Sequence, residues 1–135
     1  MAITELQAES APVTSDAPII AALANYRAAR ATYDLLPVSE VDGEQETPAE
    51  LSEWARMDAA EQEIMDRPAS TPQGVEAKLW LWLLHNQSPI EDDIAATAGN
   101  LDHFLATAAE RDWSERLIIS AIASLRAMQA TAGRA

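Results

Sequence analysis

The chain of 135 residues contains no cysteine, only four glycines and only nine lysines and arginines. The absence of cysteine excludes disulfide bonds, thiolate catalysis, and zinc or iron–sulfur sites with cysteine ligands. Because glycine is scarce and alanine occupies about a fifth of the positions, helices are favoured over strands. The composition therefore predicts an all-α protein.

The chain has few basic residues and many acidic ones. The 22 aspartates and glutamates give the chain a formal net charge of -13. Ten of these acids fall within residues 40–66, which contain a single base, Arg56, so this segment alone has a charge of -9. A negative field of this kind repels phosphate backbones and anionic membranes. We therefore expect no direct nucleic-acid binding and no membrane binding, whereas a basic protein is a candidate partner.

Long hydrophobic runs are also missing. The longest stretch of aliphatic and aromatic residues, 79–84, is too short to span a bilayer. Residues 1–17 contain no basic residue and no long apolar run, so they do not resemble a signal peptide. We expect a cytoplasmic protein in which residues 1–16 form a mobile arm and residues 17–135 form one helical domain.

Hydroxyl residues precede proline at three expected helix starts: Thr47-Pro48, Thr71-Pro72 and Ser88-Pro89. The hydroxyl oxygen can accept a hydrogen bond from a free backbone N–H, and proline suits the first helical position. A glutamate three residues after Thr47, and another three residues after Ser88, completes a capping box. Asp16 and Asp112 are expected to cap two further helices.

The spacing of apolar residues then predicts about five helices, at residues 18–36, 48–66, 72–85, 89–111 and 113–131. Prolines end the first two, which are expected to form an N-terminal antiparallel hairpin. The fourth helix has a seam of heptad spacing, although Gly99 and Asn100 weaken its middle. The members of this seam are Ile90, Ile94, Ala98, Leu101, Leu105 and Ala108. The predicted fold is an all-α bundle of about five helices.

Three charged residues interrupt the apolar stripes of the predicted hairpin: Arg30, Asp58 and Glu61. In an antiparallel pair of helices Arg30 comes near Asp58 or Glu61, and Tyr33 comes near Trp54. A clasp between the arginine and a carboxylate would explain all three charges, and its main effect would be to fix the register of the hairpin. The alternative is that all three side chains reach out to water.

Trp80 and Trp82 lie two positions apart in the expected third helix, which is about 200° around its axis. A single buried stripe cannot contain both. Either this helix is central in the bundle, or at least one of the two tryptophans belongs to a binding interface. Trp54, in the acidic helix, is a third candidate interface residue, and Trp113 is expected to pack at the corner before the last helix.

The two histidines have no catalytic or metal-binding neighbours in the sequence. We expect His85 to interact with the carboxyl end of its helix, and His103 to face solvent or a partner. The acids at residues 91–93 fall in the first turn of a helix, where the helix dipole favours them. The chain also lacks a glycine-rich phosphate loop, a nucleophile elbow and Glu-x-x-His pairs. We therefore predict no catalytic residue, no metal and no cofactor, and a protein that is not an enzyme.

Two further segments stand out, YRAAR at residues 26–30 and PASTPQGVEAKL at residues 68–79. Over residues 18–84 the chain resembles a loose group of small, uncharacterised bacterial and prophage-associated proteins that share a P-A-x-T-x-x-G-x-x-A-K-L turn between helices. The resemblance implies a helical fold and no particular activity. Local structure explains the same residues, because Thr71 is a helix cap and Gly74 leaves room for close packing.

Concentrated charge, surplus apolar surface and the lack of a catalytic cluster together predict a non-enzymatic protein. It would act through protein–protein contacts, as an adaptor or as a self-associating module. Its two surfaces would be the acidic hairpin and the helix that contains Trp80 and Trp82. The alternative is an acidic DNA mimic or an inhibitor of a nucleic-acid-binding protein, in which the acids of residues 40–66 imitate phosphates.

Overall fold

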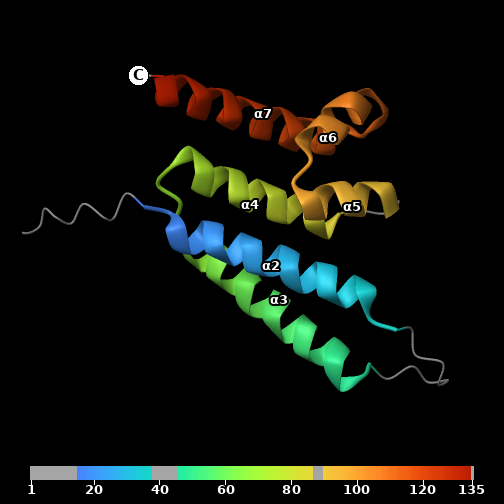
Figure 1. Cartoon of the computed structure of the whole chain (residues 1–135). Coiled ribbons are helices and arrows are strands. Elements are labelled where there is room, and N and C mark those ends of the chain that lie inside the picture. The colour runs from blue at the N-terminus through green and yellow to red at the C-terminus, as the bar shows by residue number, and fades with distance from the viewer. Residues whose placement is uncertain (1–14, 38–45, 87–89, 135) are drawn as a thin grey trace, which may run out of the picture.

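The computed structural model of the chain describes residues 15–37, 46–86 and 90–134 (Figure 1). Within these ranges the chain forms helices and no strand, which confirms the all-α prediction. The elements are α2 (Ala17–Leu35), α3 (Pro48–Asp66), α4 (Pro72–His85), α5 (Ile90–Ala98), α6 (Leu101–Thr107), the 3-10 helix η2 (Ala108–Glu110) and α7 (Trp113–Arg134). Residues 1–14 of the expected arm, most of the acidic connection and the expected start at Ser88-Pro89 lie outside the described residues.

Helix α4 lies at the centre of the bundle. It packs against α7 on one side and against α2 and α3 on the other, and α5 meets its carboxyl end (Figure 1). Trp80, Leu83 and Leu84 are completely enclosed within this arrangement. The central position explains why apolar residues surround the second half of α4, as the sequence indicates.

The two hydroxyl caps that lie within the described residues, those of Thr47 and Thr71, form as expected. Thr47 and Glu50 make a reciprocal capping box, in which the Thr47 hydroxyl accepts from the Glu50 backbone N–H at 3.1 Å and the Glu50 carboxylate accepts from the Thr47 N–H at 2.8 Å. The Thr71 hydroxyl accepts from the Gly74 N–H at 3.1 Å, and the Asp112 carboxylate accepts from the Glu115 N–H at 2.9 Å. These local bonds account for the agreement between the predicted and observed starts of α3, α4 and α7.

The prediction that Asp16 caps its own helix is wrong. Its carboxylate instead reaches the turn between α3 and α4, where it accepts from the Thr71 N–H at 2.8 Å and the Thr71 hydroxyl at 2.6 Å, and also from Ser70. The Thr71 hydroxyl has the largest effect in holding the pKa of Asp16 below its ordinary value. Asp16 is buried, so the residue expected to end the mobile arm is a fixed part of the fold.

Gly74 is required by the close approach of Asp16. A Cβ atom at position 74 would lie 2.0 Å from the Asp16 Oδ2 atom and 2.5 Å from its Cγ atom. The sequence-based interpretation that Gly74 leaves room for close packing is confirmed, and the group that needs this room is a carboxylate from the start of α2.

The prediction of one helix over residues 89–111 is wrong. Gly99 adopts a φ of 69°, a left-handed conformation that ends α5, and the Asn100 side chain caps α6 by accepting from the His103 N–H at 3.3 Å. The expected heptad seam is broken by this turn. Ile90, Ile94 and Leu105 are exposed, whereas Phe104 is enclosed against the ring of Trp80.

In the α2–α3 hairpin the expected aromatic contact is confirmed, with the Tyr33 and Trp54 rings 5.4 Å apart between their centroids. The expected clasp is not formed as predicted. Arg30 pairs with Asp93 of α5 and donates to the Leu84 carbonyl at 3.3 Å, while Glu61 pairs with His85 and Asp58 is exposed. The physical reason is that α4 and α5 cross α2 beside Arg30, so the arginine ties three helices together and not only two.

We expect Gly74→Ala to lower the free energy of unfolding by about 2 kcal/mol, because the new methyl group collides with the Asp16 carboxylate. In an Asp16→Gly background, which removes the three atoms nearest to the new methyl group, the same substitution should be neutral or stabilising by up to about 1 kcal/mol. Urea unfolding followed by circular dichroism of the four chains completes the double-mutant cycle. Equal costs of Gly74→Ala in the two backgrounds would contradict the role given to Asp16.

Candidate functional site

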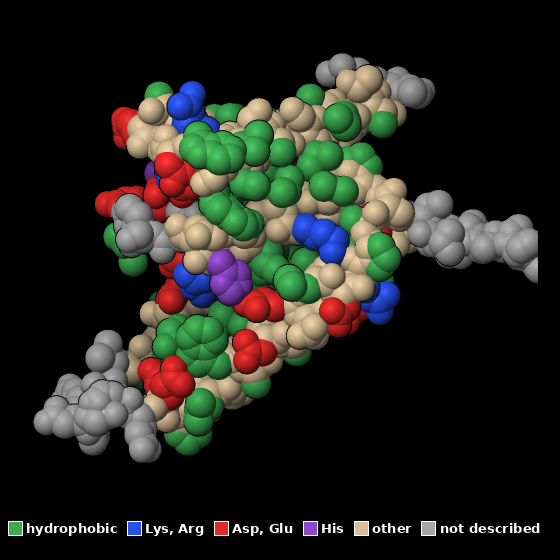
Figure 2. All heavy atoms as spheres, turned by 180° about the vertical axis from the view of Figure 1, so that it is seen from behind, with side chains coloured by type: hydrophobic (Ala, Val, Ile, Leu, Met, Phe, Trp, Pro, Cys, Tyr) green, Lys and Arg blue, Asp and Glu red, His purple; other side chains and the backbone are tan. Residues whose placement is uncertain are grey.

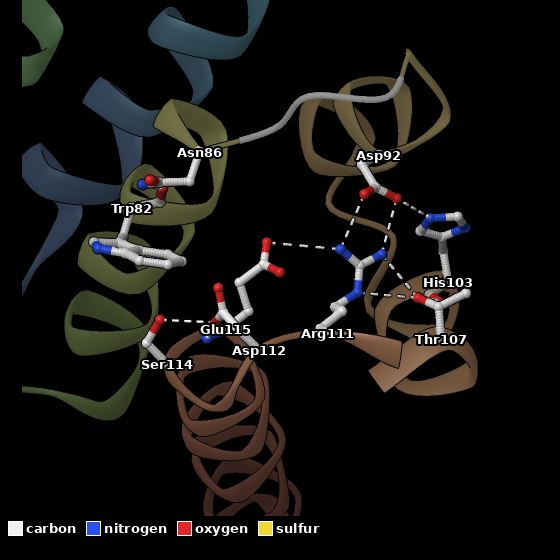
Figure 3. Close-up of polar contacts among 9 residues, drawn as sticks. All are labelled: Trp82, Asn86, Asp92, His103, Thr107, Arg111, Asp112, Ser114 and Glu115. Atoms are coloured by element: carbon white, nitrogen blue, oxygen red, sulfur yellow. Dashed lines mark hydrogen bonds and ion pairs between the residues drawn. The ribbon is translucent and has the colours of Figure 1, made fainter. Parts of the chain in front are cut away.

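A cleft with a volume of about 630 Å³ opens where α4, α5, η2 and the start of α7 meet (Figure 3). Trp82 and Asn86 of α4 form one wall, and Ser114 lies at the start of α7. Side chains from α5, α6 and the segment before α7 form the opposite wall. This cleft contains most of the polar side chains that sequence analysis considered for chemistry.

A network centred on Arg111 occupies that wall (Figure 3). The Asp92 carboxylate accepts two hydrogen bonds from the Arg111 guanidinium, at 2.9 and 2.8 Å, and lies 2.7 Å from the His103 Nε2 atom. Arg111 also donates to the Thr107 hydroxyl, at 2.8 and 3.1 Å, and its guanidinium lies 4.8 Å from the centroid of the Phe104 ring. Glu115, 3.7 Å away, provides a second carboxylate.

The charged groups of this network are largely buried and paired with one another. Only 9% of the Arg111 side chain and 13% of the Asp92 side chain are exposed. Hydrogen bonds from Arg111 are the main reason that the pKa of Asp92 lies below its ordinary value; burial opposes them, and the contact with His103 lowers the pKa further. The Asp92 bonds in turn raise the pKa of Arg111. The polar groups are thus directed at one another, and their physical effect is to fasten α5 to the start of α7.

The network corrects one sequence-based interpretation and extends another. His103 was expected to face solvent or a partner, but it is half buried against Asp92. The acids at residues 91–93 lie in the first turn of α5 as expected, and two of them also form ion pairs, Asp92 with Arg111 and Asp93 with Arg30. Within the described residues no three His, Cys, Asp or Glu side chains are grouped so that they could hold a metal ion.

A second feature is an apolar surface formed by α4 and α7, which we call the α4–α7 face. Figure 2 shows hydrophobic side chains gathered over these two helices. On α7, Trp113 is 74% exposed, Leu117 58% and Met128 56%. On α4, Val75 is exposed, and Leu79 and Trp82 are partly buried beside it. The members of the face are Val75, Leu79, Trp82, Trp113, Leu117, Ala121 and Met128.

The candidate interface tryptophans separate into three environments. Trp80 is 1% exposed and belongs to the core, so it is not available as an interface residue. Trp82 is partly buried and lies between the cleft and the α4–α7 face. Trp54 is 41% exposed on α3, where it contacts Tyr33 and lines a pocket with His85 of α4. Trp113, expected to pack at a helix corner, is largely exposed because the chain turns directly from η2 into α7 and leaves no segment to cover it.

We expect Asp92→Asn to lower the free energy of unfolding by about 2 kcal/mol, because it removes the nearer of the two carboxylates that pair with the enclosed Arg111 charge. The matched control is Glu63→Gln, which breaks the exposed Glu63–Arg67 pair and should cost less than about 0.5 kcal/mol. Thermal and urea unfolding measure both costs.

Asp92→Asn should also change the pH dependence of the free energy of unfolding. Since the folded state lowers the pKa of Asp92, its contribution is present above the ordinary aspartate pKa of about 3.9 and is lost as the pH falls below that value. Asp92→Asn should therefore lose less stability on acidification than the parent chain does. A parallel decline of the two chains would contradict this assignment.

Comparison of the chain with protein-family models, curated proteins and solved structures gives no significant match. The resemblance to prophage-associated helical proteins therefore stays a prediction. Among the helices of the described segments, none combines the length and the hydropathy needed to cross a membrane. The geometry of the cleft and of the α4–α7 face is thus the basis for assigning a function.

Proposed function

We propose that this protein is not an enzyme and acts through protein–protein contacts made by the α4–α7 face. The observation that carries the proposal is the row of exposed apolar side chains along α7, from Trp113 through Leu117 to Met128. The row spans 16 residues, from 113 to 128, or about 22 Å along the helix. An exposed apolar row of this length is typical of a contact surface, and tryptophan is a frequent anchor of such contacts.

The cleft gives less support to a catalytic role. The Asp92 carboxylate and the Thr107 hydroxyl both accept from Arg111, and His85, outside the cleft, pairs with Glu61. A general base must reach a proton on a substrate, and a nucleophile must reach the base. In the cleft the His103 Nε2 atom is directed at Asp92, and the Ser114 hydroxyl donates to Asp112 at 2.8 Å. This pairing favours a structural role for the cleft.

The alternative proposal is that the acidic hairpin imitates a nucleic acid. The position of α3 favours it, because α3 lies at the edge of the molecule remote from α7 (Figure 1). Three of its acids are nevertheless paired with cations: Glu53 with Arg56, Glu61 with His85 and Glu63 with Arg67. Titration against a basic DNA-binding protein tests mimicry, which requires binding that weakens steeply as salt is added. Salt-insensitive binding, or none, would reject it.

We expect a photo-crosslinking residue at position 117 to capture a protein in the cells that express this chain. The matched control carries the same residue in place of Leu35, which is 86% exposed at the end of α2 and lies outside the α4–α7 face. Mass spectrometry of the products identifies the captured chain, which is either a second copy or a different protein. Equal crosslinking at positions 117 and 35, or none at position 117, would contradict the proposed contact surface.

A further inference from the structure

We infer that the occupant of the α4–α7 face is a second copy of this chain, bound with its α7 antiparallel to that of the first copy. The inference rests on the proposed function and names the partner of that surface. Three observations lead to it: the order of side chains along α7, the distribution of charge over the molecule, and the size of the face.

The exposed row of α7 is complementary to itself when reversed. Residues 113, 117, 121, 124, 128 and 132 follow one another at helical spacing and lie on one stripe. Its middle contains the small residues Ala121 and Ser124, and its larger members lie towards the ends. This side of α7 is distinct from the one that contacts α4, where Ile119 and Ile122 are enclosed.

A two-fold axis between positions 121 and 124 generates a definite register. It places Leu117 opposite Met128 of the second copy, and Ala121 opposite its Ser124. Trp113, the largest side chain, then lies over the small Ala132 of the second copy. Small residues at the centre let the two helices approach closely, and each large side chain meets a partner it can pack against. A symmetric contact of this kind closes on itself and produces a dimer.

The distribution of charge also favours a second copy at this surface. Two chains with a net charge of -13 repel each other, most strongly where residues 40–66 concentrate a charge of -9. Helix α7 contains three arginines and one glutamate, a formal charge of +2, and α4 contains one glutamate and one lysine. Because α2 and α4 lie between α3 and α7 (Figure 1), the α4–α7 face is remote from the acidic helix. A basic partner would be drawn to α3 instead.

Charge along α7 selects the antiparallel arrangement. Residues 110–116, at and just before its amino end, contain three acids and two arginines, a formal charge of -1, whereas residues 124–134 contain two arginines and no acid. Antiparallel pairing brings the acidic end of one copy to the basic end of the other. It also aligns the two helix dipoles favourably, since the positive amino end of each helix lies beside the negative carboxyl end of the other.

The size of the face is sufficient for a modest dimer. A helix of 22 residues is about 33 Å long, and two helices packed side by side are about 18 Å wide. Allowing for the shorter α4, the face covers on the order of 500 Å² per copy, so a pair would bury on the order of 1,000 Å². This area is at the lower limit of specific interfaces, so we expect a reversible dimer that forms at micromolar concentrations.

Sedimentation equilibrium of the full chain tests the inference. We expect a mass of twice 14.6 kDa at high micromolar concentration, and stronger association as salt is added, because salt screens the mutual repulsion of the two copies. Leu117→Glu and Met128→Glu should each give a monomer, whereas Leu35→Glu, which adds the same charge to an exposed leucine outside the face, should remain dimeric. Circular dichroism verifies that each variant is folded.

The double variant Leu117→Glu/Met128→Lys tests the register. Each new acid would lie opposite a new base of the second copy, so dimerisation should recover, whereas a parallel pair would place like charges together. A monomeric parent chain, a dimer unaffected by Leu117→Glu and Met128→Glu, or a double variant that stays monomeric would overturn the inference. If a monomeric chain crosslinks at position 117 to a different protein, the proposed function stands and the second copy is rejected.

Discussion

The structure depends on the enclosure of α4. The Trp80 ring lies at the centre of this enclosure, and its centroid is 5.9 Å from the centroid of the Phe104 ring. The guanidinium groups of Arg27 and Arg126 lie 5.1 and 5.8 Å from the Trp80 centroid. Enclosing so large a ring contributes strongly to stability, so the other helices are positioned by the need to cover it. The α2–α3 hairpin covers one side, Phe104 of α6 another, and α7 a third. Helix α7 has no further layer outside it in the described structure, which explains why its outer stripe stays exposed.

Five of the nine basic residues connect different helices. Arg27 donates to the Ala96 carbonyl, Lys78 to the Ile64 and Arg67 carbonyls, and Arg30, Arg111 and Arg126 pair with carboxylates on other helices. These cations thus connect segments that are distant in the sequence. The acids of α3 have fewer opposite charges nearby, and the surface of the hairpin is therefore acidic. The cross-helix contacts of the cations and the acidic surface of the hairpin thus both follow from a composition with few basic and many acidic residues.

Local features were predictable from the sequence, and contacts between distant helices were not. The starts of α3 and α4 depend on bonds within three residues of Thr47 and Thr71, so they are visible in the sequence itself. The partner of Arg30 depends on where α5 crosses α2, which no local pattern specifies. The Asp92–Arg111 pair was hidden by the prediction of one helix, because 19 residues of straight helix would separate the two by about 28 Å. Only the left-handed turn at Gly99 folds the segment back and brings them together.

Charge and apolar surface also act together on assembly. An exposed apolar row such as that of α7 would, on a neutral protein, allow many non-specific contacts. Here the acids of residues 40–66 repel other copies from the hairpin, while α7 has a small positive charge. A second copy can therefore approach the α7 side of the molecule much more readily than the others. A two-fold contact on that side would bury the whole exposed row of α7. In the dimer that we propose, the acidity that first pointed to a basic partner would thus have a second physical effect, since it would limit self-association to a closed pair and oppose open chains of molecules.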